Sequence, residues 1–274
     1  MTHSATHGLS RNVGRCIYCG SEEPPLTKEH IIPAGLDGNV TLLKASCLGC
    51  ADITKRFEEH VLRGAWQGFR AQTGMRFRHK KDRPFSLLLK VRRGQTWSSE
   101  DVPIPDHLAP AAFPLFVPPA HLTGADYTGG ITLLPEAVGA LVDERWQTLL
   151  QRLGMDEGYL IQPFSPIAFA RLIAKVAYGM AIYKCGYDYF DTRYVVPCIL
   201  GQRDDVGRWV GIASGPFRNP GDSLHEVLLG LVRQEVRAYV RLFAKVGGPE
   251  YLVVLGTLAS SSGTPGLLPL QGDR

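Results

Sequence analysis

Long apolar runs and a high cysteine content are both missing from this 274-residue sequence. No stretch approaches the roughly 18 consecutive apolar residues of a membrane-spanning helix, and residues 1–7 lack the apolar core of a signal sequence. Six cysteines are too few to suggest a disulfide framework in a chain of this size. With 45% hydrophobic and 20% charged residues, the composition also excludes coiled coils, collagen-like chains and disordered proteins. We therefore expect a globular, cytoplasmic protein that does not contact membranes.

Prolines divide the sequence into two parts. Six of the 19 prolines fall between residues 102 and 120, where they interrupt regular structure. We predict a disordered N-terminus over residues 1–14, a compact module with a basic extension over 15–93, a proline-rich linker over 94–125, and a second domain over 126–274. The second domain has no internal repeat, phosphate-binding glycine loop or nucleophile elbow. Its candidate roles are target selection, regulation and homo-oligomer formation.

Hydrophobic periodicity predicts α+β structure in both parts. In the first, strands at 29–33 and 40–43 precede a helix over 51–63, where Ile53, Phe57 and Val61 recur at helical spacing before Gly64. A further strand is predicted at 85–91. In the second, Ser165 and Pro166 suggest the start of a helix that runs to about residue 184. Helical spacing at 135–153 and strand-like runs at 195–200, 208–212, 227–243 and 251–258 complete an α+β domain with an antiparallel sheet.

Two C-x2-C pairs are the most specific motif in the sequence. Cys16 and Cys19 form the first pair, and Cys47 and Cys50 form the second. Two thiolates separated by two residues can occupy neighbouring corners of a zinc tetrahedron, and a second pair completes it. A zinc ion with four cysteine ligands has no open position, so we predict a structural Zn²⁺ that stabilises a small module. The alternative is two reduced cysteine pairs without metal.

Positive charge is concentrated in the first third of the chain. Residues 1–93 contain 16 Lys and Arg against 8 Asp and Glu, whereas residues 94–274 contain 14 against 18. The aromatic residues Trp66, Phe69 and Phe77 lie among these cations, a pattern typical of surfaces that contact phosphates and stack on bases. The alternative is a solvated basic surface whose aromatic residues face the core. The candidate nucleic-acid-binding residues are Lys55, Arg56, Arg63, Arg70, Arg76, Arg78, Lys80 and Lys81.

The segment between the cysteine pairs reads Leu26-Thr27-Lys28-Glu29-His30-Ile31-Ile32-Pro33. With the glycine-containing loop and the second C-x2-C that follow, it resembles the His-Asn-His (HNH) endonucleases, specifically the branch with two cysteine knuckles. The resemblance covers about residues 15–64. It implies a zinc-stapled ββα-metal nuclease module that hydrolyses phosphodiester bonds in DNA. It further implies that His30 is the general base and that Glu29 binds a second, catalytic divalent cation, with Mg²⁺ the default.

The chain departs from the pattern of that family at two positions. The position usual for the middle asparagine is Leu42, so Asn39 is the nearest candidate to orient His30, unless it serves only as a turn residue. The residue after the last cysteine is Ala51, which cannot bind metal. Glu58, two helical turns further on, is our candidate second ligand in preference to Asp52 or His60, unless it merely pairs with Lys55. The rival hypothesis is therefore a non-catalytic zinc-knuckle protein that binds nucleic acid, DNA rather than RNA, with a degenerate nuclease site.

Overall fold

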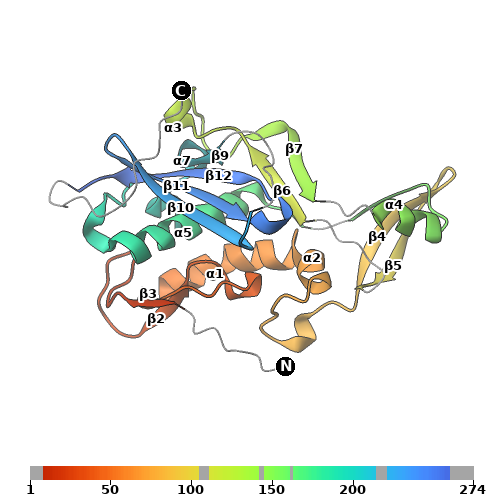
Figure 1. Cartoon of the computed structure of the whole chain (residues 1–274), viewed down its shortest axis with the longest axis horizontal. Coiled ribbons are helices and arrows are strands. Elements are labelled where there is room, and N and C mark those ends of the chain that lie inside the picture. The colour runs from red at the N-terminus through yellow and green to blue at the C-terminus, as the bar shows by residue number, and fades with distance from the viewer. Residues whose placement is uncertain (1–8, 105–110, 142–144, 161–162, 214–220, 260–274) are drawn as a thin grey trace.

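A computed structural model describes residues 9–104, 111–141, 145–160, 163–213 and 221–259. The fold is mixed α+β, as predicted, with antiparallel pairing in all of its sheets except for one short parallel strand. Figure 1 shows a central helix, α5 (Pro166–Cys185), between a four-stranded sheet and the helix α1 (Leu48–Arg63). The strands β4 (Ser86–Arg93) and β5 (Thr96–Pro103) and the helix α4 (Arg145–Arg152) project at one end of the molecule.

The N-terminal part is built around one hairpin. Strand β2 (Leu26–His30) pairs antiparallel with β3 (Thr41–Cys47), and the 3₁₀ helix η1 (Ala34–Leu36) lies in the connection between them. Strand β1 (Ser10–Asn12) pairs parallel with the other edge of β3, which supplies it with backbone partners. The disordered segment predicted over residues 1–14 is therefore wrong for residues 10–12, and residues 1–8 lie outside the described part of the chain.

Helix α1 follows β3 without a loop, so the second cysteine pair spans the junction between strand and helix. It begins at Leu48, three residues before the predicted start, and buries Thr54, Phe57 and Val61 on one face. Gly64 ends it, as predicted. A Cβ atom at this position would lie 2.3 Å from the carbonyl oxygen of Pro163, so only glycine fits there. Helix α2 (Gln67–Gln72) and the 3₁₀ helix η2 (Lys80–Asp82) follow.

Helix α5 forms the centre of the fold. The predicted N-cap is present, since the Ser165 hydroxyl accepts a hydrogen bond from the Ala168 backbone N–H at 3.2 Å. The helix is apolar on nearly all sides because α1 covers one face and the four-stranded sheet covers the other. Its length and composition would suffice to cross a membrane, but 67% of its apolar window is buried inside the protein.

The four-stranded sheet is antiparallel, as predicted. It contains β9 (Val210–Ile212), β10 (His225–Val232), β11 (Glu235–Leu242) and β12 (Glu250–Thr257) in the order β10-β11-β12-β9. The strand-like run at 227–243 is a hairpin of two strands, since Arg233 adopts a φ of 57° and reverses the chain between them. The run at 195–200 is instead helix α6 (Val196–Ile199), because Pro197 occupies a first-turn position that favours helix. The remaining elements in this part are helix α7 (Val206–Trp209) and the 3₁₀ helices η4 (Tyr187–Tyr189) and η5 (Ala244–Val246).

The proline-rich stretch is not a linker. It contains β5 (Thr96–Pro103), β6 (Ala111–Phe116) and α3 (Ala120–Thr123). The prolines fit because Pro103 ends its strand, Pro114 lies at a register irregularity of β6, and Pro119 precedes α3. Strand β6 pairs with β7 (Leu133–Leu141), so the helix predicted from residue 135 is confirmed only as α4 (Arg145–Arg152). The third sheet has the order β5-β4-β8, where β4 is Ser86–Arg93 and β8 is Glu157–Leu160.

One core joins segments from every predicted domain. Trp66 is fully buried, and its ring lies 5.6 Å from Phe113 of β6, 5.1 Å from Phe169 of α5 and 5.0 Å from Phe243, which follows β11. Its indole N–H also donates to the carbonyl oxygen of Ala112 at 2.8 Å. The predicted boundaries at residues 93 and 125 therefore do not separate independent cores. A smaller apolar cluster lies between the third sheet and α4; its buried members are Leu89, Val91, Val102, Leu150 and Met155.

Candidate functional site

The four predicted cysteines gather at one end of the β2–β3 hairpin. Their sulfur atoms all lie within 4.8 Å of one another, and the Sγ atoms of Cys19 and Cys47 are 3.7 Å apart. Two sulfurs bound to one tetrahedral zinc at about 2.3 Å would lie about 3.8 Å apart. All four thiols are free. The cluster can therefore hold a structural metal ion, and zinc suits a set of four sulfur donors.

The hairpin, α1 and the segment around residues 76–82 enclose a pocket of about 690 Å³. Six basic and four acidic side chains line it. The predicted site residues Glu29, His30 and Glu58 lie together in this lining, although Glu58 comes from α1 and the other two come from the end of β2. The further lining residues are Lys28, Pro33, Ala34, Gly35, Ala51, Thr54, Lys55, Glu59, Leu62, Arg63, Gln67, Arg70, Arg76, Phe77, Arg78 and Asp82.

The predicted phosphate-binding cations are distributed unevenly around this pocket. Lys55, Arg63, Arg76 and Arg78 are exposed and line it, together with Lys28, which the sequence did not single out. Arg63 also pairs with Asp82, at an N···O distance of 3.3 Å. The other three exposed candidates, Arg56, Lys80 and Lys81, lie outside the lining. The pocket therefore presents five exposed cations, of which one is partly neutralised.

Arg70, predicted as a phosphate ligand, is a structural residue. It is 4% exposed, and its guanidinium donates to the carbonyl oxygens of Gly35 at 2.7 Å, Leu62 at 2.8 Å and Arg76 at 2.6 Å. Burial lowers the pKa of Arg70 to about 10, so the group remains charged at neutral pH. It joins η1, α1 and the segment beyond α2, and it thereby fixes the wall of the pocket.

A lysine that the sequence did not indicate lies beneath the two candidate metal ligands. The Nζ atom of Lys175, on α5, is 2.7 Å from Oε1 of Glu29 and 2.8 Å from Oε1 of Glu58. It also donates to the carbonyl oxygen of His30 and, at 3.3 Å, to that of Ile31. Burial alone would lower the pKa of Lys175, but the two carboxylates outweigh it and raise that pKa above its usual value. Lys175 is therefore an ammonium ion held by four oxygen atoms.

The imidazole of His30 is half-buried at the edge of the pocket. Burial lowers the pKa of His30, and the positive charges of Lys28 and Lys175 lower it further. The ring is therefore neutral at pH 7, the form that can accept a proton. Its Nδ1 atom is buried and has no hydrogen-bond partner among the described residues.

No family model matches this chain, and no curated protein or solved structure matches it significantly. The resemblance noted above therefore depends on the short motif alone. Asn39 does not support it, because this residue is exposed and lies outside the pocket lining. Ala51 lines the pocket but provides only a methyl group. Among the three interleaved aromatic residues, Trp66 and Phe69 pack in the core against Phe243, and Phe77 alone lines the pocket.

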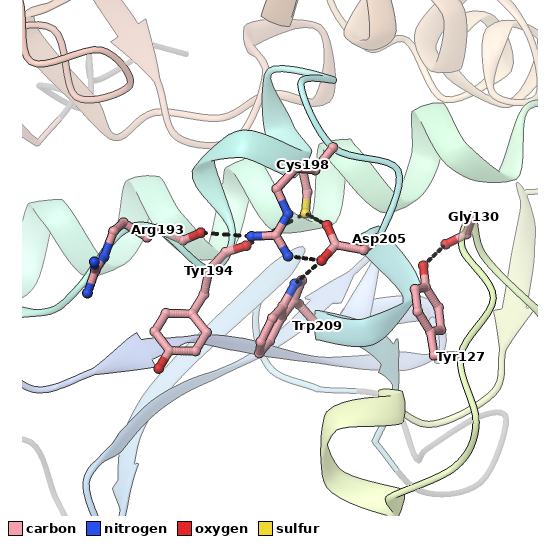
Figure 2. A network of polar contacts seen from close by, with 8 residues as sticks. Tyr127, Gly130, Arg193, Tyr194, Cys198, Asp205 and Trp209 are labelled. Carbon is pink, nitrogen blue, oxygen red and sulfur yellow. Dashed lines mark hydrogen bonds and ion pairs between the residues drawn. The ribbon is translucent and has the colours of Figure 1, made fainter.

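A second polar network surrounds Asp205 on the far side of α5 (Figure 2). Its carboxylate accepts hydrogen bonds from the Cys198 thiol at 2.9 Å and from the Trp209 indole at 3.3 Å, and it pairs with Arg203. Burial and the hydrogen bond to Asp205 raise the pKa of the Cys198 thiol, so this cysteine is an unreactive donor. The network links α6 to α7 and is internally satisfied, which indicates a structural role.

Proposed function

We propose that this chain is a zinc-knuckle protein that binds nucleic acid, with DNA expected, in the basic pocket beside the cysteine cluster. The exposed cations Lys28, Lys55, Arg76 and Arg78 around the 690 Å³ pocket support this proposal more than any other observation. Lys175 adds to it, since it offsets one of the two carboxylate charges at the bottom of the pocket. With that carboxylate charge offset, the exposed cations around the pocket attract phosphates.

Salt dependence of binding tests this proposal. Four or five phosphate contacts predict a slope of log K against log [salt] of about −4 to −5 for duplex DNA. The variant Arg76→Ala is expected to reduce the magnitude of the slope by about one. Lys245→Ala, which changes an exposed lysine in η5 outside the pocket lining, is the matched control. A slope near zero for both DNA and RNA would refute nucleic-acid binding, and a clear preference for RNA would correct the expected substrate.

The second candidate function is an endonuclease, the activity implied by the motif around His30. The half-buried neutral imidazole beside Lys28 favours it. In this mechanism His30 accepts a proton from a water molecule, the water oxygen bonds to phosphorus, and the phosphorus–oxygen bond to the leaving group breaks. The leaving oxygen takes a proton from solvent. The pocket cations would stabilise the additional negative charge on the phosphate.

A plasmid-nicking assay separates the two functions. We would compare the wild-type protein with His30→Ala, in Mg²⁺, in Mn²⁺ and without added divalent ion. His79→Ala, a change at an exposed histidine outside the pocket lining, is the control. Nicking that His30→Ala abolishes at unchanged zinc content would support the endonuclease. Nicking at equal rates in both proteins would end the catalytic assignment of His30, and DNA binding without nicking would leave the binding function alone.

A further inference from the structure

We infer that Lys175 permanently occupies the position between Glu29 and Glu58, where the sequence analysis expects a catalytic divalent cation. The pair of carboxylates is then a lysine site and not a metal site. This inference concerns the side chains of this chain, and it holds whether or not the pocket binds nucleic acid.

The surroundings of the lysine match those of a bound cation. Four oxygen atoms face its Nζ, two from carboxylates and two from the main-chain carbonyls of His30 and Ile31. The distances of 2.7 and 2.8 Å to Glu29 and Glu58 are those of charge-assisted contacts to an ammonium group. Magnesium would need oxygens at about 2.0–2.1 Å. The observed distances are therefore those of an ammonium ion lying between the two carboxylates, not those of a bound Mg²⁺.

The position of Lys175 makes this arrangement permanent. The residue lies within the 20-residue helix α5, and its side chain is 1% exposed. Its neighbours on the same helix face also contact the N-terminal part: the Tyr178 hydroxyl donates to the carbonyl oxygen of Ile17, and a Cβ atom at Gly179 would lie 3.5 Å from the Ile31 side chain. Withdrawing the ammonium group would leave the carboxylates of Glu29 and Glu58 without their cation inside the protein, at a high energetic cost.

Among the described residues, Glu29 and Glu58 belong to no wider cluster of metal-binding side chains. In the described part of the chain, the four cysteines are the one group of three or more metal-binding side chains whose ligand atoms lie close together. Ala51 offers no donor, and its backbone carbonyl already accepts from the Thr54 hydroxyl at 3.1 Å. A divalent ion placed beside Glu29 and Glu58 would face the positive charge of Lys175 at short range. The energetic cost of that repulsion excludes joint occupancy.

Titration of the zinc-loaded protein with Mn²⁺, followed by electron paramagnetic resonance, tests the inference. We expect the wild-type protein and Glu58→Gln to bind Mn²⁺ equally weakly, because neither uses the carboxylates for metal. Lys175→Ala should bind one Mn²⁺ at least about tenfold more tightly than wild type, as its two uncovered carboxylates require a cation. The double variant Lys175→Ala/Glu58→Gln should lose this gain. Lys184→Ala, which changes an exposed lysine on the same helix, is the control.

Two results would overturn the inference. The first is tight Mn²⁺ binding by the wild-type protein that Glu58→Gln abolishes, and this comparison remains decisive if Lys175→Ala does not fold. The second is a folded Lys175→Ala that binds Mn²⁺ no better than wild type. Acetylation of the native wild-type protein provides a further check by mass spectrometry. Lys184 should react while Lys175 stays unmodified, and rapid modification of Lys175 would contradict its burial.

Discussion

The imidazole of His225 contacts the main chain of Leu36, which lies 189 residues earlier in the chain, and that of Phe243. Its Nε2 atom lies 2.8 Å from the carbonyl oxygen of Leu36 in η1, and its Nδ1 atom lies 3.1 Å from the backbone nitrogen of Phe243. A backbone N–H can only donate, so Nδ1 accepts and Nε2 carries the proton of a neutral ring. His225 therefore connects the end of β11 and the start of β10 to the loop that forms one wall of the pocket.

The first prediction is a loss of stability in acid. Burial lowers the pKa of His225 below its value in the unfolded chain, so protonation favours unfolding. The neutral His225 ring therefore stabilises the folded protein. Its contribution to the free energy of unfolding is complete above the unfolded pKa of about 6.5 and is lost as the pH falls through the lower pKa of the folded state. We expect the melting temperature to decrease less between pH 7.5 and pH 5.5 in His225→Gln than in the wild type. His79→Gln, at an exposed position, should behave like the wild type, and parallel curves for all three proteins would contradict the role of His225.

Removal of metal should unfold the hairpin end of the protein. A structural zinc ion contributes on the order of 10–16 kcal/mol of apparent binding free energy, and much of it is coupled to folding. We therefore expect a chelator, or the variant Cys47→Ser, to lower the melting temperature and the zinc content together. Cys185→Ser provides the comparison, because that thiol lies outside the cluster. Full stability of the wild-type protein after complete zinc removal would show that the four cysteines do not need a metal.

Replacement of Trp66 should be among the most damaging single changes in the core. Trp66→Ala removes a fully buried indole, three edge-to-face ring contacts and the hydrogen bond to Ala112. Deletion of a buried tryptophan costs about 3–5 kcal/mol. Urea denaturation should show this loss in the free energy of unfolding. Trp97→Ala, at a side chain that is 40% exposed, should cost much less, and equal costs would argue against a shared core around Trp66.

Arg70 and Arg78 should respond differently to the same substitution. Arg70→Met leaves the carbonyl oxygens of Gly35, Leu62 and Arg76 without their guanidinium donors, and each buried acceptor without a partner costs about 1–3 kcal/mol. We expect a loss of at least about 2 kcal/mol in unfolding free energy. Arg78→Met should leave stability unchanged and weaken DNA binding, because Arg78 is exposed in the pocket lining. The reverse pattern would show that Arg70 binds phosphate.

Local elements were predictable where short-range patterns decide them. The two cysteine pairs, the stop of α1 at Gly64 and the start of α5 at Ser165 each depend on a few neighbouring residues. The stretch over 94–125 was not predictable in this way. Its prolines suggested a loop, but Pro103 and Pro114 occupy positions where a strand tolerates the missing N–H. Whether such a position exists depends on the partner strand, which the local sequence does not specify.

The amino-acid sequence by itself determined which groups the site contains: four thiols in two pairs, the adjacent Glu29 and His30, and a surplus of cations before residue 94. Only the tertiary structure decided what those groups do together. It buried Arg70, which supports the pocket wall, and it left Asn39 outside the pocket lining. It also placed Lys175 between Glu29 and Glu58. The physical reason is distance along the chain. Helix α5 begins more than a hundred residues after β2, so no spacing rule links Lys175 to Glu29, and their attraction arises only when the core brings them together.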